Sequence, residues 1–127
     1  MRILLIAVLA TASFAASPVQ IWTPGELKTS ASQLATHPDA ATIAGKTLGS
    51  YGTHSISLWR RAKSGEAELH KTKTDLIVIE DGSATLLVGG TIPDAHTTLP
   101  NEVRGSAIRG GESKKVSPGD IIRIPPG

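Results

Sequence analysis

The sequence predicts a single all-β domain with one short N-terminal helix. From Ile43 to Ile124, short runs of alternating or β-branched apolar residues are separated by Gly, Pro and Asp, which is typical of strands joined by turns. One stretch near the N-terminus instead has helical spacing. The 127 residues are enough for one domain and too few for two ordinary ones.

The helix is predicted to begin after Thr23-Pro24-Gly25-Glu26. Thr23 would be the N-cap, Pro24 the first helical residue and Glu26 the partner in a capping box. Apolar side chains at spacings of four, seven and eight then share one helical face: Leu27, Ala31, Leu34 and Ala35. His37-Pro38 ends the helix, because a residue before proline disfavours the helical region. His37 is predicted to be a cap or a solvent-facing residue.

Two strands are predicted next, over Lys46–Tyr51 and His54–Arg61. In the second, Ile56 and Leu58 alternate with polar residues, so they should share one face. His54 begins this strand, where it either faces the interior or caps the strand end.

The central stretch runs from Gly65 to Gly90. Glu68 and His70 are separated by one residue on a predicted strand, so their side chains point the same way. An apolar run from Asp75 to Ile79 and another from Ala84 to Val88 are joined through Asp81-Gly82, which predicts an antiparallel hairpin between them.

The segment Thr91–Arg104 is predicted to be irregular, because Pro93, Pro100 and Asn101 interrupt it, and His96 is its only histidine. Short strands are expected over Ser106–Ile108 and Lys114–Val116. Pro118-Gly119-Asp120 should form a tight turn before a last strand containing Ile121, Ile122 and Ile124.

The central stretch resembles the first motif of the cupins. That motif is His-x-His, followed by three or four residues and a Glu, and then by six residues and a Gly. Glu68 and His70 occupy the two His positions, Asp75 the Glu position and Gly82 the Gly position. The segment Ser117–Gly127 is similar to the start of the second motif, P-G-D-x-x-x-I-P-x-G-x-x-H. The resemblance covers roughly residues 45–127 and implies a cupin-type double-stranded β-helix, a jelly-roll barrel.

In a cupin, these positions hold a metal ion, so the resemblance implies Glu68, His70 and Asp75 as ligands. Two carboxylates and one imidazole suit manganese, iron or zinc. The motif's last His, the usual fourth ligand, would lie three residues beyond Gly127. The expectation is therefore a fragment that lacks its C-terminal strands and has an open sheet edge, although a natural short form is an alternative.

Residues 1–16 are predicted to be a signal peptide. Arg2 is followed by an apolar stretch from Ile3 to Ala10, and small residues lie at Ser13 and Ala15. The apolar stretch is far shorter than the roughly 20 residues that span a bilayer. The expected organisation is thus a signal peptide (1–16), an N-terminal extension with a helix (17–44) and a cupin domain (45–127), exported to the periplasm or secreted. The absence of Cys means that this fold forms without disulfides.

A formal charge of +2, with scattered basic residues, does not favour nucleic acid, and no membrane contact is expected once the signal is removed. The expected partner is a small molecule, and the open edge is compatible with a homodimer. Three functions stay open: small-molecule binding through a divalent metal, a metal-dependent dioxygenase or isomerase, and a metal-free structural or interaction module. In the last, Glu68 and Asp75 would form surface ion pairs with Lys71 or Lys73.

Overall fold

The structure is a computed structural model that describes residues 19–127. The predicted signal peptide, residues 1–16, lies outside the described residues. Within them the chain is mostly β with one α-helix, as the sequence predicts, and it has nine short strands. No helix in this part of the chain has both the length and the apolar character needed to cross a membrane.

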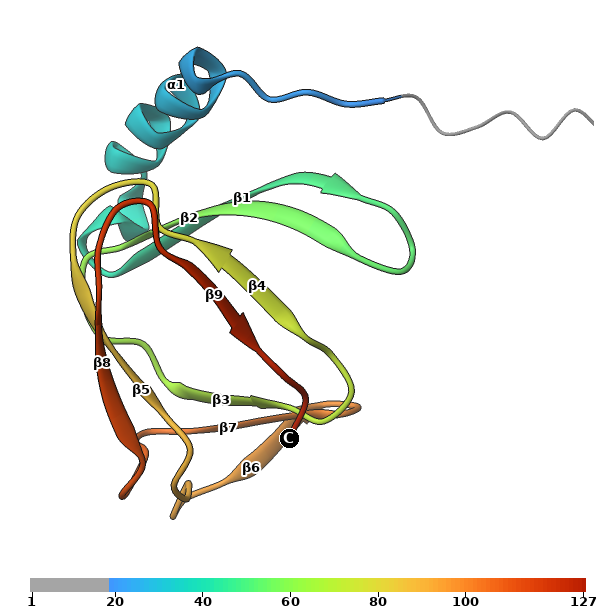
Figure 1. Cartoon of the computed structure of the whole chain (residues 1–127), viewed down its shortest axis with the longest axis vertical. Helices are drawn as coiled ribbons and strands as arrows, with labels where there is room; N and C mark the ends of the chain where they lie inside the picture. The colour runs from blue at the N-terminus through green and yellow to red at the C-terminus, as the bar shows by residue number, and fades with distance from the viewer. Residues whose placement is uncertain (1–18) are drawn as a thin grey trace, which may run out of the picture.

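The helix α1 (Pro24–Ala35) begins where the sequence predicts. Thr23 Oγ1 accepts a hydrogen bond from the Glu26 backbone N–H, and Glu26 Oε2 accepts one from the Thr23 N–H at 2.8 Å, which completes the capping box. The backbone and side-chain hydrogen bonds from Thr23 hold the pKa of Glu26 below its usual value. Leu34 is buried, and α1 packs against the first two strands (Figure 1). A 3₁₀ helix, η1 (Pro38–Ala41), follows. His37 is its N-cap, with Nδ1 accepting from the Asp39 N–H at 3.2 Å, whereas the C-cap of α1 itself is Thr36.

The first two strands, β1 (Ile43–Ser50) and β2 (Ser55–Arg61), form an antiparallel pair. The turn between them carries Gly52 at φ 75°, a conformation that suits glycine. Tyr51 and His54 stack across this turn, with ring centroids 5.0 Å apart. His54 is exposed and lies at the start of β2, so it is part of the turn and not of the interior.

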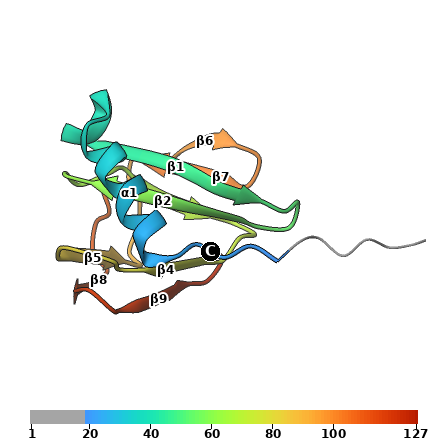
Figure 2. The same cartoon turned by 90° about the horizontal axis from the view of Figure 1, so that it is seen from above.

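The remaining strands are β3 (Ala67–His70), β4 (Asp75–Val78), β5 (Ala84–Val88), β6 (His96–Leu99), β7 (Glu102–Gly105), β8 (Glu112–Val116) and β9 (Ile121–Ile124). Their pairing is nested: β4 with β9, β5 with β8, and β6 with β7, all antiparallel. An isolated bridge between Thr91 and Arg109 continues the ladder between the second and third pairs. Residues 75–99 and 102–124 are therefore two arms of one long ribbon. In Figure 2, the pairs β4–β9 and β5–β8 lie below β1–β2.

The ribbon bends at two opposed glycine pairs, Gly89-Gly90 and Gly110-Gly111. All four glycines have positive φ. A Cβ on Gly90 would collide with the backbone oxygen of Arg109 and come within 2.9 Å of the Gly110 carbonyl carbon. The two arms thus approach too closely at this bend for a larger residue.

Three predictions about the strands are wrong. The runs Asp75–Val78 and Ala84–Val88 do not form a hairpin with each other, because each pairs with a strand from the other arm, β9 and β8. The segment predicted to be irregular instead contains the hairpin β6–β7, which turns at Pro100-Asn101. Asn101 has φ 66°, and Pro followed by a residue of positive φ is the preference of a type II turn. Consequently the strand predicted over residues 106–108 lies earlier, at β7.

Apolar side chains of the ribbon fall on two faces. In β4–β9, Asp75 is paired with Ile124 and Ile77 with Ile122, while Val78 and Ile121 lie on the opposite face. Among the described residues only four apolar residues are buried: Leu34, Ala44, Ala67 and Val116. The interior is accordingly not filled by large side chains, and it contains the cavity described below.

Candidate functional site

The candidate site forms where β3 pairs with β7. Their antiparallel register places Glu68 opposite Arg104 and His70 opposite Glu102. Because side chains alternate along a strand, these four lie on the same face of the sheet. β7 also pairs with β6, so it is the central strand of a three-stranded sheet.

The three predicted site residues lie together. His70 Nε2 is 3.8 Å from Glu68 Oε2 and 3.6 Å from Asp75 Oδ2. These are ion-pair distances and are too long for hydrogen bonds. The His70 side chain is 19% exposed, so the imidazole is largely enclosed, whereas that of Asp75 is 42% exposed.

Two residues that the sequence did not suggest complete the cluster. Glu102, only 14% exposed, places Oε2 3.6 Å from His70 Nδ1. Arg104 donates from Nε to Glu102 Oε1 at 2.8 Å and from Nη1 to Glu68 Oε1 at 3.1 Å. One guanidinium thus holds one oxygen of each carboxylate and leaves the other oxygen beside the imidazole. Charge-assisted hydrogen bonds of this kind are among the stronger side-chain contacts.

The same contacts shift the ionisation of the pair. The hydrogen bond from Arg104 is the main cause that lowers the pKa of Glu102, and it outweighs the effect of burial. The hydrogen bond to Glu102 likewise raises the pKa of Arg104, with Glu68 contributing. Both groups are therefore charged at neutral pH.

Arg61 and Glu66 lie at the edge of this cluster. Arg61 Nη2 is 3.7 Å from Glu68 Oε1, and Arg104 Nη1 is 3.8 Å from Glu66 Oε2. Both outer side chains are about half exposed, so these longer contacts contribute little to stability. The Arg61 contact does add a second positive charge near Glu68, beside that of Arg104.

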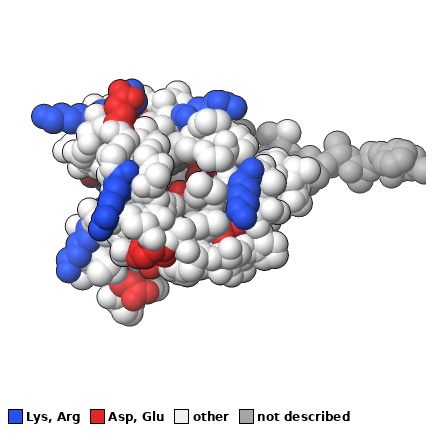
Figure 3. Space-filling view, turned by 90° about the horizontal axis from the view of Figure 1, so that it is seen from below, with Lys and Arg blue, Asp and Glu red and all other residues white. Residues whose placement is uncertain are grey.

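A cavity of about 420 Å³ adjoins His70. Glu68, His70, Lys73 and Asp75 line one part of it. The remaining walls come mostly from apolar residues of β5, β7, β9 and the segments beside them, including Val88, Ile92, Val103, Ile108 and Ile124. Figure 3 shows a hollow on this side of the molecule, with acidic atoms in it and Lys and Arg side chains around it. Its volume is within the usual range of small-molecule pockets.

The donors at this cavity suit a divalent metal ion by their chemistry. Within residues 19–127, no group of three or more His, Asp or Glu side chains is arranged so as to hold a metal ion. Each of the two distances from His70 Nε2 to a carboxylate oxygen is nevertheless short enough for an ion to lie between the two atoms. Two donors that are each about 2.1 Å from an ion are at most about 4.2 Å apart.

The other histidines of the described residues lie away from the cavity. His96 is on β6 and is exposed, with Nδ1 3.2 Å from the Asp94 carbonyl oxygen. His37 and His54 have the capping and turn positions described above. None of the three lines the cavity.

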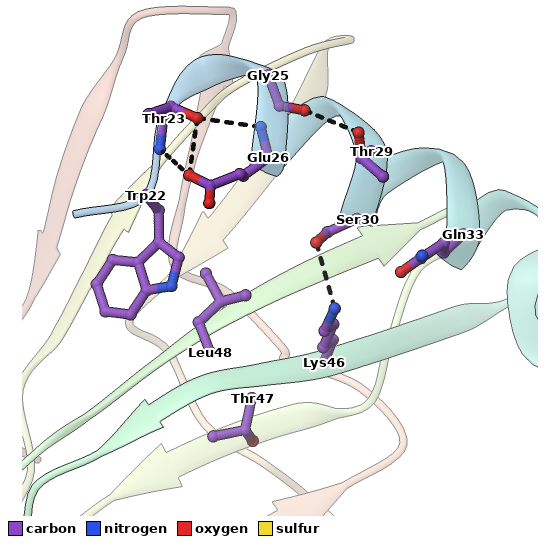
Figure 4. Close-up of a pocket in the computed structure, with 10 residues that line it drawn as sticks. All are labelled: Trp22, Thr23, Gly25, Glu26, Thr29, Ser30, Gln33, Lys46, Thr47 and Leu48. Atoms are coloured by element: carbon purple, nitrogen blue, oxygen red, sulfur yellow. Dashed lines mark hydrogen bonds between the residues drawn. The ribbon is translucent and has the colours of Figure 1, made fainter. Parts of the chain in front are cut away.

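A second, more open cavity of about 630 Å³ lies between α1 and β1 (Figure 4). At this cavity the Glu26 carboxylate accepts the hydrogen bond from Thr23 N–H that caps α1. Lys46 Nζ donates to Ser30 Oγ at 3.3 Å. The cavity contains no histidine and no pair of carboxylates. It is larger than the first cavity, but it offers no group of side chains suited to metal binding or catalysis.

No known family model matches the sequence, and neither a curated protein nor a solved structure shows significant similarity to it.

Proposed function

We propose that this chain is an exported cupin-type β-domain that binds a small molecule through a divalent metal ion held by Glu68, His70 and Asp75. The observation that carries the proposal is the position of His70 Nε2. It lies within 4 Å of one oxygen from each carboxylate, beside a cavity of about 420 Å³.

The nested pairing of β4–β9, β5–β8 and β6–β7 supports the jelly-roll part of the proposal. A jelly roll is a long antiparallel ribbon wrapped into two sheets, and nested pairs that bend at glycines are what such wrapping requires. The export part rests on the sequence of residues 1–16 alone.

Each residue of the cluster has a distinct part in this function. Glu68 and Asp75 supply oxygen donors, and His70 supplies Nε2. Arg104 holds Glu68 through the oxygen that does not face the imidazole. A divalent ion bound there would polarise a ligand oxygen as a Lewis acid.

A metal-dependent dioxygenase or isomerase is the second candidate function. It would use the same three ligands, and it is favoured by the cavity beside them, since catalysis needs room for a substrate next to the metal. Turnover distinguishes it from binding alone. A metal-free structural or interaction module is the third, and it requires that no ion binds at His70.

The test is metal binding by the purified chain, measured by calorimetry with Mn(II), Zn(II) and, without oxygen, Fe(II). The expected result is one ion per chain, with an affinity reduced at least about tenfold in Glu68→Gln, His70→Ala and Asp75→Asn. His96→Ala is the matched control, because His96 is an exposed histidine outside the cavity.

An equal affinity in wild type and His70→Ala would overturn the proposal, as would the absence of binding by wild type. Equal losses in His70→Ala and His96→Ala would show that binding is not specific to the cavity. Circular dichroism of each variant establishes that a loss of affinity does not come from unfolding.

A further inference from the structure

The cavity beside His70 has two chemically different parts. Its charged residues all come from one short segment, 68–75, which includes the end of β3 and the loop to β4. The rest of its wall comes from β5, β7, β9 and adjoining segments, and most of those residues are apolar. A complementary ligand has one polar end and an apolar body, because burial of apolar surface against such walls is favourable.

The polar part of the cavity wall includes the ammonium group of Lys73. It lies in the exposed loop between β3 and β4, and it lines the cavity. Within residues 19–127 it forms no ion pair, whereas Arg61 and Arg104 are both paired with carboxylates. An ammonium group at the edge of an apolar cavity can therefore accept an anionic partner from a ligand.

The balance of charge decides when an anion is favoured. Four carboxylates lie in or around the cluster, those of Glu66, Glu68, Asp75 and Glu102, against three cations, Arg61, Lys73 and Arg104. One negative charge remains if His70 is neutral. With a divalent ion held by the predicted ligands, the balance becomes one positive charge, so the loaded site attracts an anion more strongly than the metal-free site does.

We propose that the ligand of this cavity is a small aliphatic carboxylate, with its carboxylate group beside Lys73 and the metal ligands and its hydrocarbon chain along the apolar wall. This inference rests on the proposed metal-dependent function and names the chemical class of the ligand. An alcohol of the same length lacks the negative charge of the carboxylate, and an amine of the same length carries a positive charge instead.

The probes are hexanoate, hexan-1-ol and hexylamine, titrated into the zinc-loaded and the metal-free protein and followed by NMR chemical shifts. Hexanoate should bind the loaded protein at least about tenfold more tightly than either analogue, and weakly or not at all without zinc. Affinity should rise from acetate to butanoate to hexanoate by about two- to fourfold per methylene, because each added group is buried.

The lysine variants test the polar end of the ligand. Lys73→Met should weaken hexanoate binding about tenfold. Lys71→Met is the matched control, since Lys71 lies in the same loop but does not line the cavity.

Tighter binding of hexylamine or hexanol than of hexanoate would overturn the inference, while zinc binding that is lost in His70→Ala would leave the proposed function standing. Equal hexanoate affinity in wild type and Lys73→Met would also overturn it. If zinc does not bind at all, both fail, and the calorimetric titration shows this before any ligand is added.

Discussion

Arg104 and Glu102 lie two residues apart on β7, and Arg104 Nε donates to Glu102 Oε1 at 2.8 Å. The second oxygen of Glu102 lies 3.6 Å from Nδ1 of His70. Arg104 also donates to Glu68 on the neighbouring strand at 3.1 Å. Thus a single guanidinium determines where two carboxylates lie relative to one imidazole.

Replacing Arg104 should disturb both carboxylates. We expect Arg104→Met to lower the free energy of unfolding by about 1 kcal/mol, because Glu102 is left largely enclosed without its charged partner. Zinc affinity should fall about tenfold as Glu68 loses its fixed orientation. Urea unfolding and calorimetry measure the two effects.

Arg123→Met is the control for this experiment. Arg123 is an exposed residue of β9 with no ion pair within residues 19–127, so its replacement should change neither quantity. A zinc affinity for Arg104→Met equal to that of wild type would contradict the orienting role of Arg104.

Glu102 should influence metal binding at the proposed site through His70. A histidine that binds a metal through one ring nitrogen commonly has a carboxylate beside the other, which keeps the ligating nitrogen deprotonated and oriented. Glu102→Gln keeps the shape and removes the charge, so zinc affinity should fall about tenfold. Nitrogen chemical shifts of the His70 ring should also show less of the tautomer protonated at Nδ1.

The matched control is Glu112→Gln on β8, because Glu112 is an exposed carboxylate paired only with Lys114 in this part of the chain. If Glu102→Gln left the His70 tautomer unchanged, Glu102 would have no positioning role, whatever its effect on stability.

Local features of the sequence predicted the local features of the fold. The capping box at Thr23 and Glu26 depends on residues three positions apart, and the β1–β2 pair joins neighbours across a short turn. The period-two spacing of Glu68 and His70 likewise places both on one face of β3. Such relationships involve a few residues and follow from backbone geometry.

The pairing of distant strands was not predictable in the same way. Asp75 is paired with Ile124 and Ala84 with Val116, and no local pattern distinguishes these partners from a hairpin through Asp81-Gly82. The sequence does not indicate a role for Glu102 and Arg104, because Pro100 and Asn101 are as typical of an irregular segment as of a hairpin turn. They form a tight turn, after which Glu102-Val103-Arg104 has the alternation of a strand.

The bend of the ribbon makes Gly90 sensitive to substitution. Gly90→Ala adds a Cβ against the Arg109 backbone oxygen and also forces alanine to positive φ, so we expect a loss of about 2 to 4 kcal/mol in the free energy of unfolding. Gly52→Ala is the control, because Gly52 has the same φ of 75° but open space around its Cβ position. It should cost about 1 kcal/mol. Equal losses for the two variants in urea unfolding would show that the arms do not approach closely at Gly90.

Acid should weaken the fold partly through Asp94, at the start of the β6–β7 hairpin. Its carboxylate oxygens accept from the Ser106 backbone N–H at 2.9 and 3.1 Å. Hydrogen bonding from Ser106 lowers the pKa of Asp94 from its usual 3.8. Because the pKa is lower in the folded state, the contribution to stability is present above pH 3.8 and is lost as the pH falls through the folded value.

Asp94→Asn tests this contribution, since asparagine cannot lose a charge on acidification. Between about pH 5 and 3, the free energy of unfolding should fall less in Asp94→Asn than in wild type, as measured by urea unfolding at each pH. Glu26 and Glu102 also have lowered pKa values, so both proteins should still lose stability in acid, and the difference between them isolates Asp94. Asp81→Asn, in the turn after β4, should follow the wild-type curve because Asp81 has no hydrogen-bond or ion-pair partner within residues 19–127. Parallel curves for wild type and Asp94→Asn would contradict the stabilising contact with Ser106.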